Sequence, residues 1–460
     1  MRQIVFALAI LQLGAQLALA ENFSDIAARN WHQWRGPNGD GVSDSANPPI
    51  EWSETKNIKW KVEIPGKGTA TPIIWGDHVF VLSAIKTDRQ KEGTQVAAQT
   101  ESPRQEQPQG RRGGRSGRRG FGFGAPAPTN HYQFVVICFD RKTGKQMWQT
   151  VATEEVPHEA GHETNTFASA SPTTDGQFVY ASFGSRGIYC FDMEGNLQWD
   201  CDFGEMRTAA RFGEGSSPAL RDDTLVVPWD HEGDSFIVAL DAKTGKEKWK
   251  VDREEGTTWA TPFIVDYDGR TQVVMHGRQV RSYDFATGEL IWECGGQASN
   301  PIATPVVHDG LVFCMTGHRG FAIYAIPLSA RGDITDSGTI AWHTKEAGPY
   351  VLSPVVYKGQ LYFTKARNGV LLSRDAKTGE PLIDETRLPG IDQLYASAVA
   401  AADRIYLTGR SGTTLVLKHG HEFDVLASNT LDEGIDASAA LVDNELFLRG
   451  ESHLYCVAVE

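Results

Sequence analysis

The chain has 460 residues, a formal net charge of -14, 40% hydrophobic residues and 22% charged residues. This composition is ordinary for a folded globular protein, and the acidic balance argues against nucleic acid as a partner of its main body. Length alone predicts about three domains of ~150 residues each. Internal repeats replace that estimate with one repeat domain at residues 52–460, which follows an export signal at 1–20 and a lead-in at 21–51.

Residues 1–20 have the pattern of a cleavable targeting signal. Arg2 precedes an apolar stretch from Ile4 to Leu13, and residues 18–20 form a small-x-small cleavage site. The apolar stretch is too short to span a membrane comfortably, and no Cys follows the cleavage site as a lipid acceptor. We therefore expect a periplasmic or secreted protein with no transmembrane span and no lipid anchor.

A dipeptide of Ser or Thr followed by Pro, or of Ser followed by Ala, recurs along the chain. From Pro172 onward its second residue returns every 41 to 49 residues, whereas the first interval is 100 residues long. Such a period is typical of four-stranded propeller blades. The sequence predicts an all-β, eight-bladed propeller whose inner strands are announced by Pro72, Pro172, Pro218, Pro262, Pro305, Pro354, Ala398 and Ala439.

The long first interval contains a low-complexity insertion at residues 88–130, between the second and third strands of the first blade. It is rich in Gln, Gly and Arg, including the run at 111–119, and this composition cannot bury a core. We expect it to be disordered. Two interpretations stay open: weak contact with an anionic surface such as envelope lipid or glycan, and a loop expansion without a role.

A second motif places a Trp after a tight turn. The pattern Asp-x-x-Thr-Gly-x-x-x-Trp occurs at residues 140–148, 241–249 and 284–292, with a shorter copy at 192–199 and a copy without Trp at 375–379. Gly tolerates the positive φ of the hairpin, and Asp accepts hydrogen bonds from turn amides. Because a Trp repeated in most blades cannot mark one active site, we expect packing between blades for Trp148, Trp199, Trp249, Trp292 and Trp342.

The two ends of the repeat region predict how the ring closes. The last unit has strands at 437–441, 445–449 and 453–459 and then stops without an outer strand, whereas residues 57–64 carry a spare Trp60 before the first blade. We predict that this N-terminal segment completes the eighth blade, which leaves no open sheet edge.

The six cysteines of an exported chain raise the question of disulfides. Cys138, Cys190 and Cys456 share one repeat position, two residues before the turn Asp, where other repeats have Ala or Ser. This pattern favours small-residue packing over pairing. Cys190 and Cys201 are expected to face each other across one hairpin, so a disulfide between them stays open, provided that their Cβ atoms lie about 4 Å apart.

Candidate binding residues lie in loops expected to converge on one face around the axis. Loops before the inner strands supply His162, Glu163 and Trp259, among other polar and aromatic groups. The loops between second and third strands would form a cationic ring suited to carboxylate or phosphate, and solvated turn residues are the alternative. One Arg lies in each of six such loops: Arg186, Arg278, Arg319, Arg367, Arg410 and Arg449.

The sequence contains no Gly-x-Ser-x-Gly, His-Glu-x-x-His or phosphate-loop motif. Histidine and carboxylate side chains near the loop face suit zinc and similar ions, but their spacing matches no established motif, so we expect no metal. Nothing identifies a nucleophile or a general base. The side chains considered for a metal are His158, His162, Glu163, Asp230, His231 and Glu232.

The repeat set resembles the PQQ-like eight-bladed propellers, whose tryptophan-docking motif is the Asp-x-x-Thr-Gly-x-x-x-Trp pattern. The resemblance covers residues 52–460, and the opening Trp31-His-Gln-Trp34-Arg35-Gly36-Pro37 resembles that of a large group of exported bacterial members. The superfamily contains quinoprotein dehydrogenases, which bind pyrroloquinoline quinone. It also contains the cofactor-free propeller lipoprotein of the outer-membrane barrel assembly machinery, to which the predicted architecture is most similar, without the lipid-acceptor Cys.

The resemblance implies two alternative functions. The first is a monomeric, non-catalytic scaffold without a cofactor, whose loop face binds an envelope protein or an anionic polymer. The second is a dehydrogenase of alcohols or sugars that uses pyrroloquinoline quinone with calcium. In that case Trp259 would form the floor under the quinone, and Arg319 or Arg367 would face its carboxylates. Because the chain lacks the Cys-Cys pair and the Cys-x-x-Cys-His motif frequent in those enzymes, we expect the first.

Overall fold

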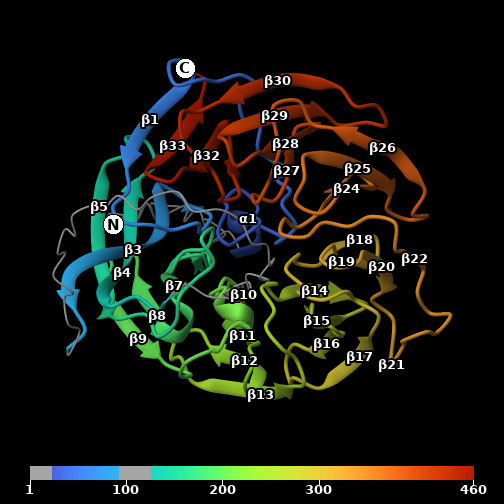
Figure 1. Cartoon of the computed structure of the whole chain (residues 1–460), viewed down its shortest axis with the longest axis horizontal. Coiled ribbons are helices and arrows are strands. Elements are labelled where there is room, and N and C mark those ends of the chain that lie inside the picture. Colours follow the sequence, from blue (N-terminus) through green and yellow to red (C-terminus); the bar gives the residue numbers. More distant parts are fainter. Residues whose placement is uncertain (1–22, 93–125, 460) are drawn as a thin grey trace, which may run out of the picture.

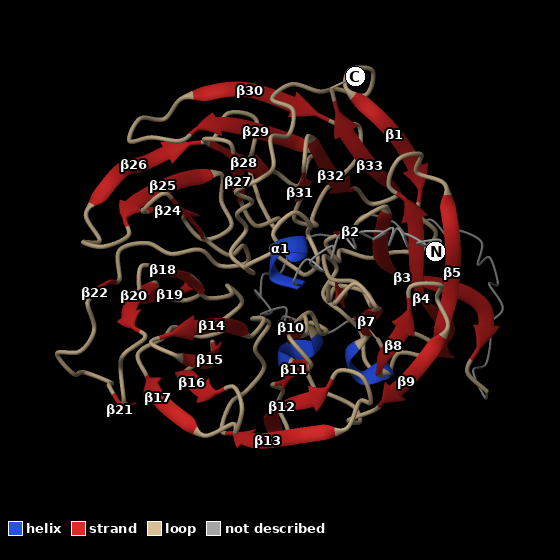
Figure 2. Ribbon diagram, turned by 180° about the vertical axis from the view of Figure 1, so that it is seen from behind, coloured by secondary structure: helices blue, strands red, loops and turns tan. Residues whose placement is uncertain are grey.

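The computed structural model describes residues 23–92 and 126–459, which form a closed ring of antiparallel sheets around one axis (Figure 1). There are eight sheets; seven have four strands, and one has an additional two-residue strand at its outer edge. The short helix α1 (Phe23–Ala27) lies near the axis (Figure 2). The predicted eight-bladed propeller is therefore confirmed, whereas the expected export signal lies outside the described residues.

In each blade the strands follow one another from the axis outward. Blade 1 contains β2 (Ile73–Trp75), β3 (His78–Gln90), β4 (Asn130–Asp140) and β5 (Gln146–Glu155). Blade 2 contains β6 (Thr173–Thr174), β7 (Phe178–Ser182), β8 (Ile188–Asp192) and β9 (Leu197–Cys201). Blade 3 contains β10 (Ala219–Arg221), β11 (Thr224–Trp229), β12 (Ser235–Asp241) and β13 (Glu247–Arg253). Blade 4 contains β14 (Phe263–Tyr267), β15 (Arg270–Met275), β16 (Val280–Asp284) and β17 (Leu290–Cys294), with β21 (Gly332–Asp333) at its edge.

The second half of the ring repeats this order. Blade 5 contains β18 (Val306–His308), β19 (Leu311–Thr316), β20 (Ala322–Pro327) and β22 (Trp342–Thr344). Blade 6 contains β23 (Val355–Tyr357), β24 (Gln360–Thr364), β25 (Val370–Asp375) and β26 (Pro381–Arg387). Blade 7 contains β27 (Val399–Ala401), β28 (Arg404–Thr408), β29 (Thr413–Lys418) and β30 (Val425–Thr430). Blade 8 contains β31 (Ala440–Val442), β32 (Glu445–Arg449), β33 (His453–Ala458) and β1 (Ile58–Glu63).

Blade 8 joins the two ends of the chain. β1 pairs antiparallel with β33, and Trp60 lies opposite Cys456 in that pairing. The predicted closure is confirmed, because the N-terminal strand supplies the outer strand that the C-terminal repeat lacks.

The outer-strand Trp of one blade packs on the turn Gly of the next. The indole nitrogen of Trp249 donates a hydrogen bond to the backbone oxygen of Phe285 at 2.9 Å, and a Cβ on Gly288 would lie 2.8 Å from the indole ring. The glycine is needed both for its positive φ and for its missing side chain. The same docking joins Trp60, Trp148, Trp199 and Trp342 to Gly144, Gly195, Gly245 and Gly379.

Trp292 lies at a blade junction but docks differently. It is fully buried, and its indole nitrogen donates to Gln272 of its own blade at 3.3 Å. Gln272 in turn donates to the backbone oxygen of Leu328 in the following blade at 3.0 Å. The strand β21 pairs with β17, with Gly332 next to Trp292. An inserted strand and a bridging amide thus replace the turn glycine at this junction.

A small residue lies opposite each docking Trp. Cys138 faces Trp148 and Cys190 faces Trp199, whereas Ala239 takes the same position opposite Trp249. The cysteines are therefore packing residues, and all six are free thiols. The pairing expected between Cys190 and Cys201 is wrong, because the hairpin turns between Asp192 and Asn196, which places Cys190 opposite Trp199 and Cys201 opposite Ile188.

The recurring Ser or Thr before each inner strand forms a belt of hydrogen bonds around the axis. The backbone N–H of Thr304, for example, donates to the Oγ of Ser353 at 2.9 Å, and the N–H of Ser353 donates to the Oγ of Ser397 at 2.9 Å. Seven such links run from Thr71 to Ser438. At the junction of blades 8 and 1, the buried hydroxyl of Thr71 has no hydrogen-bond partner.

The lead-in crosses the end of the ring opposite the loops that precede the inner strands. Trp31 pairs with Ile74 of blade 1, and the N–H of Ser43 donates to Ala400 of blade 7 at 3.0 Å. Between them, the buried guanidinium of Arg35 donates to the backbone oxygen of Pro354 at 2.5 Å. The opening Trp-x-x-Trp-Arg-Gly-Pro is therefore a structural bridge across the ring.

The two ends of the predicted insertion belong to blade 1. β3 and β4 extend past the ring as a ribbon in which Gln90 pairs with Asn130, and the N–H of Lys91 donates to Thr129 at 2.7 Å. The expected disorder over 88–130 is wrong for these ends, because the two strands continue to pair. The remainder of the insertion, residues 93–125, lies outside the described residues.

Candidate functional site

The loops between second and third strands and the loops before inner strands share one end of the ring, which we call the loop face. The two kinds of loop touch. Arg367 between β24 and β25 donates to the hydroxyl of Tyr395 before blade 7 at 2.9 Å, and the guanidinium of Arg410 lies 4.3 Å from the centre of the Tyr395 ring. Tyr395 is thus held between two arginines from neighbouring blades.

A cavity of about 230 Å³ lies on the axis below the loop face. Its wall is the hydroxyl belt, and Trp34 of the lead-in lines it as well. Of the predicted site residues, His162, Trp259 and Arg367 line this cavity. The axial cavity therefore combines hydroxyls, aromatic rings, the guanidinium of Arg367 and the carboxylate of Asp436.

Two of the predicted arginines are neutralised by carboxylates. Arg186 forms ion pairs with Glu155 at 2.6 Å and with Glu205 at 2.9 Å. Arg410 donates from Nε and Nη2 to Asp436 at 2.7 and 2.9 Å. The expected ring of free cations is consequently interrupted at blades 2 and 7.

Blades 4, 5 and 6 keep arginines without an ion pair in the described part of the chain. Arg278 is exposed, and its backbone N–H donates to Glu255 at 2.9 Å. Arg319 is exposed with a φ of 53°. Partial burial, followed by the charges of Arg319 and Arg367, lowers the pKa of His318. Positive charge is therefore concentrated around His318.

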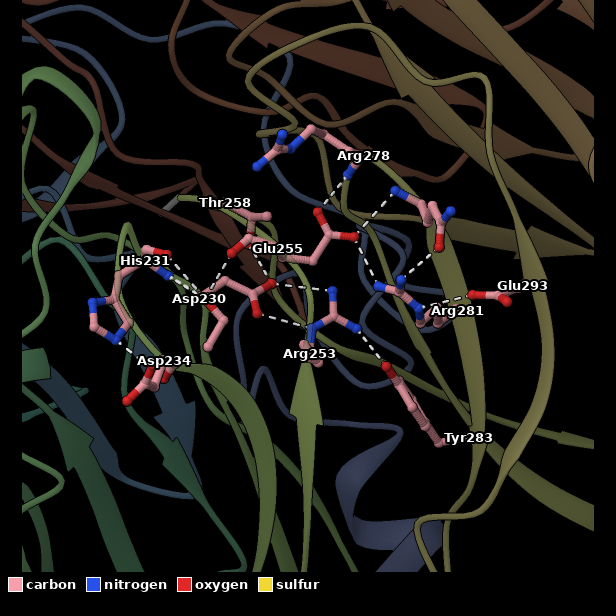
Figure 3. A network of polar contacts seen from close by, with 12 residues as sticks. Asp230, His231, Asp234, Arg253, Glu255, Thr258, Arg278, Arg281, Tyr283 and Glu293 are labelled. Atoms are coloured by element: carbon pink, nitrogen blue, oxygen red, sulfur yellow. Dashed lines mark hydrogen bonds and ion pairs between the residues drawn. The ribbon is translucent and has the colours of Figure 1, made fainter.

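A buried ion pair lies between blades 3 and 4 (Figure 3). Arg253 donates from Nε and Nη2 to the carboxylate of Asp230 at 2.8 and 3.1 Å, and from Nη1 to the hydroxyl of Tyr283 at 2.7 Å. Thr258 adds a further donor to Asp230 at 3.0 Å. The geometry fixes the blade junction and leaves Asp230 fully engaged, so this carboxylate has a structural role.

Glu255 anchors the neighbouring loop in the same network. Its carboxylate accepts hydrogen bonds from the backbone N–H groups of Arg278 and Gln279 at 2.9 and 3.2 Å, and from Nη1 of Arg281 at 2.8 Å. These contacts hold the loop that carries the exposed Arg278 side chain.

Sequence reasoning missed Arg253 as a buried residue. The sequence does contain a sign of this burial. Side chains alternate between the two faces of a strand, and Arg253 lies four residues after Trp249, so both point to the same, buried face of β13. A charged residue on the buried side of an outer strand indicates a partner inside the ring, since buried charges are normally paired.

Two further carboxylates lie half-buried near Trp259, and sequence reasoning missed both. Glu214 accepts hydrogen bonds from the backbone N–H and the hydroxyl of Ser185, and Glu159 accepts from the N–H and the hydroxyl of Thr208. Both line a cavity of about 60 Å³. Burial raises the pKa of Glu214. Both residues lie in irregular loops, so no strand alternation indicates that they turn inward.

The side chains considered for a metal are used elsewhere. His158 bonds through Nε2 to the backbone oxygen of Met206 at 2.7 Å, and His231 accepts at Nδ1 from the N–H of Arg207 at 3.1 Å. Glu232 accepts from Thr257. Within residues 23–92 and 126–459, no group of three or more His, Cys, Asp or Glu side chains is arranged to hold a metal ion.

Glu163 lies in a separate cavity of about 490 Å³ at the junction of blades 8 and 1, which we call the junction cavity. His162 and Arg410 line it too, together with Arg449. Arg449 is only 2% exposed, unlike the turn residue that the repeat pattern predicted. The predicted loop residues are therefore divided between two cavities.

The chain matches known proteins in family and in fold. A family model described as outer membrane protein assembly factor BamB matches residues 89–237 and 132–383. No curated protein matches the sequence. Among solved structures, BamB from Moraxella catarrhalis is 15% identical, with a TM-score of 0.50 over 70% of this chain and 88% of that chain.

Quinohemoprotein alcohol dehydrogenases have a similar fold. The enzyme from Comamonas testosteroni is 11% identical, with a TM-score of 0.62 over 95% of this chain and 82% of that chain. The corresponding enzyme from Pseudomonas putida HK5 is 10% identical, with a TM-score of 0.59 over 95% of this chain and 81% of that chain. At these identities the likeness concerns the fold alone.

No helix among the described residues is long and apolar enough to cross a membrane. The family match spans more than half of the sequence, and the eight blades with their docking tryptophans agree with it. The chain therefore belongs to the family of PQQ-like β-propellers described as outer membrane protein assembly factor BamB.

Proposed function

We propose that this propeller is a non-catalytic binding protein of the cell envelope, whose loop face holds an anionic partner. The observation that carries the proposal is the cluster of Arg319, Arg367 and His318 on blades 5 and 6, in which neither arginine forms an ion pair within the described residues. In a chain with a net charge of -14, such a cluster attracts anionic groups, by an amount that falls with salt.

The partner is a protein surface or an anionic polymer. The matching family is described as outer membrane protein assembly factor BamB, and the Moraxella catarrhalis structure has the same name. This description favours an envelope location for the present chain. The expected export signal at residues 1–20 agrees with that location. We further propose a monomer, because ring closure by β1 pairs the edge of blade 8 that another chain would otherwise extend.

The alternative, a quinone-dependent dehydrogenase, fits these residues poorly. The cavity beside Trp259 has about 60 Å³, and the axial cavity has about 230 Å³, whereas ordinary ligand pockets have roughly 300–1,000 Å³. The nearby carboxylates of Glu159, Glu214 and Asp230 already accept hydrogen bonds from protein donors. Both oxygens of Glu214 and of Asp230 and the Oε1 of Glu159 are engaged in this way, so these carboxylates hold the protein's own loops, and we derive no reaction through this cofactor.

The first experiment compares arginine variants on a column of immobilised alginate, a polymer of acidic sugars. The double variant Arg319→Ala/Arg367→Ala is expected to elute at lower salt than the wild type. Arg270→Ala/Arg331→Ala removes the same charge away from the loop face and is expected to elute close to the wild type. Equal elution of the two double variants would contradict a localised binding patch.

A second experiment tests the absence of catalysis. The purified protein is incubated with pyrroloquinoline quinone and calcium, and its absorption spectrum and dye-linked oxidation of alcohols and sugars are recorded. We expect neither a bound-quinone spectrum nor oxidation above the quinone-only control. Turnover that depends on added quinone would overturn the non-catalytic proposal.

A further inference from the structure

Arg449 is a buried cation for which the described part of the chain provides no carboxylate partner. Its guanidinium makes one hydrogen bond, from Nη1 to the backbone oxygen of Ala70 at 3.4 Å. Burial lowers the pKa of Arg449 to about 9, and no neighbouring charge opposes that effect. By contrast, the buried Arg253 has Asp230 as its counter-ion.

The missing side chain of Gly68 makes room for this guanidinium. A Cβ on Gly68 would lie 2.2 Å from Nη2 of Arg449, so a larger residue there would displace the side chain. Arg449 lines the junction cavity of about 490 Å³. A buried charge is costly without a partner, and the junction cavity that Arg449 lines has room for a counter-ion.

We propose that the junction cavity binds a small carboxylate-bearing ligand, whose carboxylate pairs with the guanidinium of Arg449. A planar guanidinium and a carboxylate match as two parallel hydrogen bonds. This site is distinct from the Arg319 and Arg367 cluster, so either proposal can fail alone.

The other lining groups select the kind of acid. Besides Arg449, the charged groups that line the junction cavity are Lys67, Glu163, Glu451 and the ion pair of Arg410 with Asp436. Cationic and anionic side chains are equal in number there, so a singly charged anion is better matched than a doubly charged one. Thr69, Thr164 and Asn165 add hydroxyl and amide groups, which can exchange hydrogen bonds with ligand hydroxyls. A singly charged acid with several hydroxyl groups, such as a uronic acid, fits this combination. It is present either as a free sugar acid or within an acidic polysaccharide.

The test uses glucuronate as the probe and glucose as the uncharged control of similar size. In calorimetry and thermal melts, glucuronate is expected to bind the wild type and raise its Tm, because a ligand of the native state stabilises it, whereas glucose does neither. Inorganic phosphate is expected to bind more weakly than glucuronate. If alginate competes with glucuronate, the polymer is a source of the ligand; if it does not, the free acid is.

The matched variants are Arg449→Met and Arg331→Met. Arg449→Met removes the charge and retains most of the volume, and it is expected to weaken glucuronate binding by about tenfold or more, the loss of a charge-assisted bond. Arg331→Met, in the exposed segment between β20 and β21, is expected to bind like the wild type. Arg449→Lys keeps the positive charge but lacks the two parallel N–H donors of a guanidinium. Its affinity for glucuronate is expected to lie between those of the wild type and Arg449→Met.

The wild-type titrations decide the matter even if Arg449→Met does not fold. Equal responses to glucuronate and glucose would show that Arg449 does not select a carboxylate, and no response to either would show that the junction cavity takes no such ligand; each result would overturn the proposal. The same holds if Arg449→Met folds and binds glucuronate as tightly as the wild type.

Discussion

Neighbouring blades are joined by one set of contacts at the rim and by another at the axis. The residues that make these contacts vary more at the rim than at the axis. At the rim, the same Trp-on-Gly contact connects each of blades 8, 1, 2, 3 and 5 to the blade that follows it. After blades 4, 6 and 7, other contacts take its place. At the axis, the hydroxyl belt is unbroken through seven links and is interrupted once, between blades 8 and 1.

The replacements at the rim show why variation is tolerated there. After blade 6, the hydroxyl of Tyr362 contacts His419 Nδ1 at 2.8 Å and accepts from the N–H of Gly420 at 3.2 Å. Beside blade 7, the buried Trp52 of the lead-in donates its backbone N–H to Asn429 at 2.9 Å. The rim has space for substitute groups from other segments, whereas every position of the belt carries a Ser or a Thr.

The largest expected effect concerns the strand that closes the ring. Deleting residues 23–64 removes β1 and leaves β33 as an unpaired edge. We expect loss of the cooperative thermal transition and aggregation, measured by circular dichroism and size-exclusion chromatography. As a control, replacing residues 93–125 by a short Gly-Ser linker is expected to preserve the transition, because Lys91 and Thr129 are already hydrogen-bonded. A deletion variant that melts like the wild type would contradict the role of β1.

The next effect compares two rim contacts. Trp249→Ala is expected to lower the free energy of unfolding by about 3–5 kcal/mol through lost burial and a cavity, since Trp249 is 8% exposed. Trp249→Phe also loses the bond to Phe285, whereas Trp292→Phe loses only a 3.3 Å contact to a side chain that keeps its bond to Leu328. Urea titrations should therefore show the smaller loss for Trp292→Phe, and the reverse order would contradict the described difference.

These junctions also show which parts of the structure the sequence could predict. The blade number, the closure and the docking of Trp249 followed from spacing, because each repeat solves the same packing problem with the same residues. The place of Trp292 at a blade junction also followed, but its mode of docking did not, since the strand β21 beside it comes from an insertion without a repeat signature. Of the arginines, the repeat register placed Arg319 correctly on an exposed turn, but it could not show the burial of Arg449.

The third prediction concerns pH and the lead-in. Burial lowers the pKa of His32 from 6.5 to about 4, and its ring packs against Phe23 at 5.4 Å and near Trp75 at 6.2 Å. Between these pH values the unfolded chain binds a proton that the folded protein does not. The His32 contribution is therefore fully present above pH 6.5 and is lost as the pH falls toward 4, by about 3 kcal/mol at most.

His32→Phe should reduce this loss of stability in acid, and the exposed His421→Phe should not. The measurement is the urea midpoint at pH 7.5, 6 and 4.5 for the wild type and both variants. Equal acid dependence in the wild type and His32→Phe would assign the loss to other groups.

The smallest expected effects test the hydroxyl belt itself. Ser353→Ala removes the acceptor for the N–H of Thr304 and leaves that buried donor unpaired, at a cost of about 1–3 kcal/mol. Thr71→Val changes the equivalent position at the junction of blades 8 and 1, where the hydroxyl is buried without a partner. Because no hydrogen bond is lost there, the free energy of unfolding should stay within about 0.5 kcal/mol of the wild type or rise. Thermal and urea unfolding of the two variants provide the comparison. A loss at Thr71 as large as that at Ser353 would mean that the belt is closed in solution and that the junction beside Arg449 is no different from the other seven.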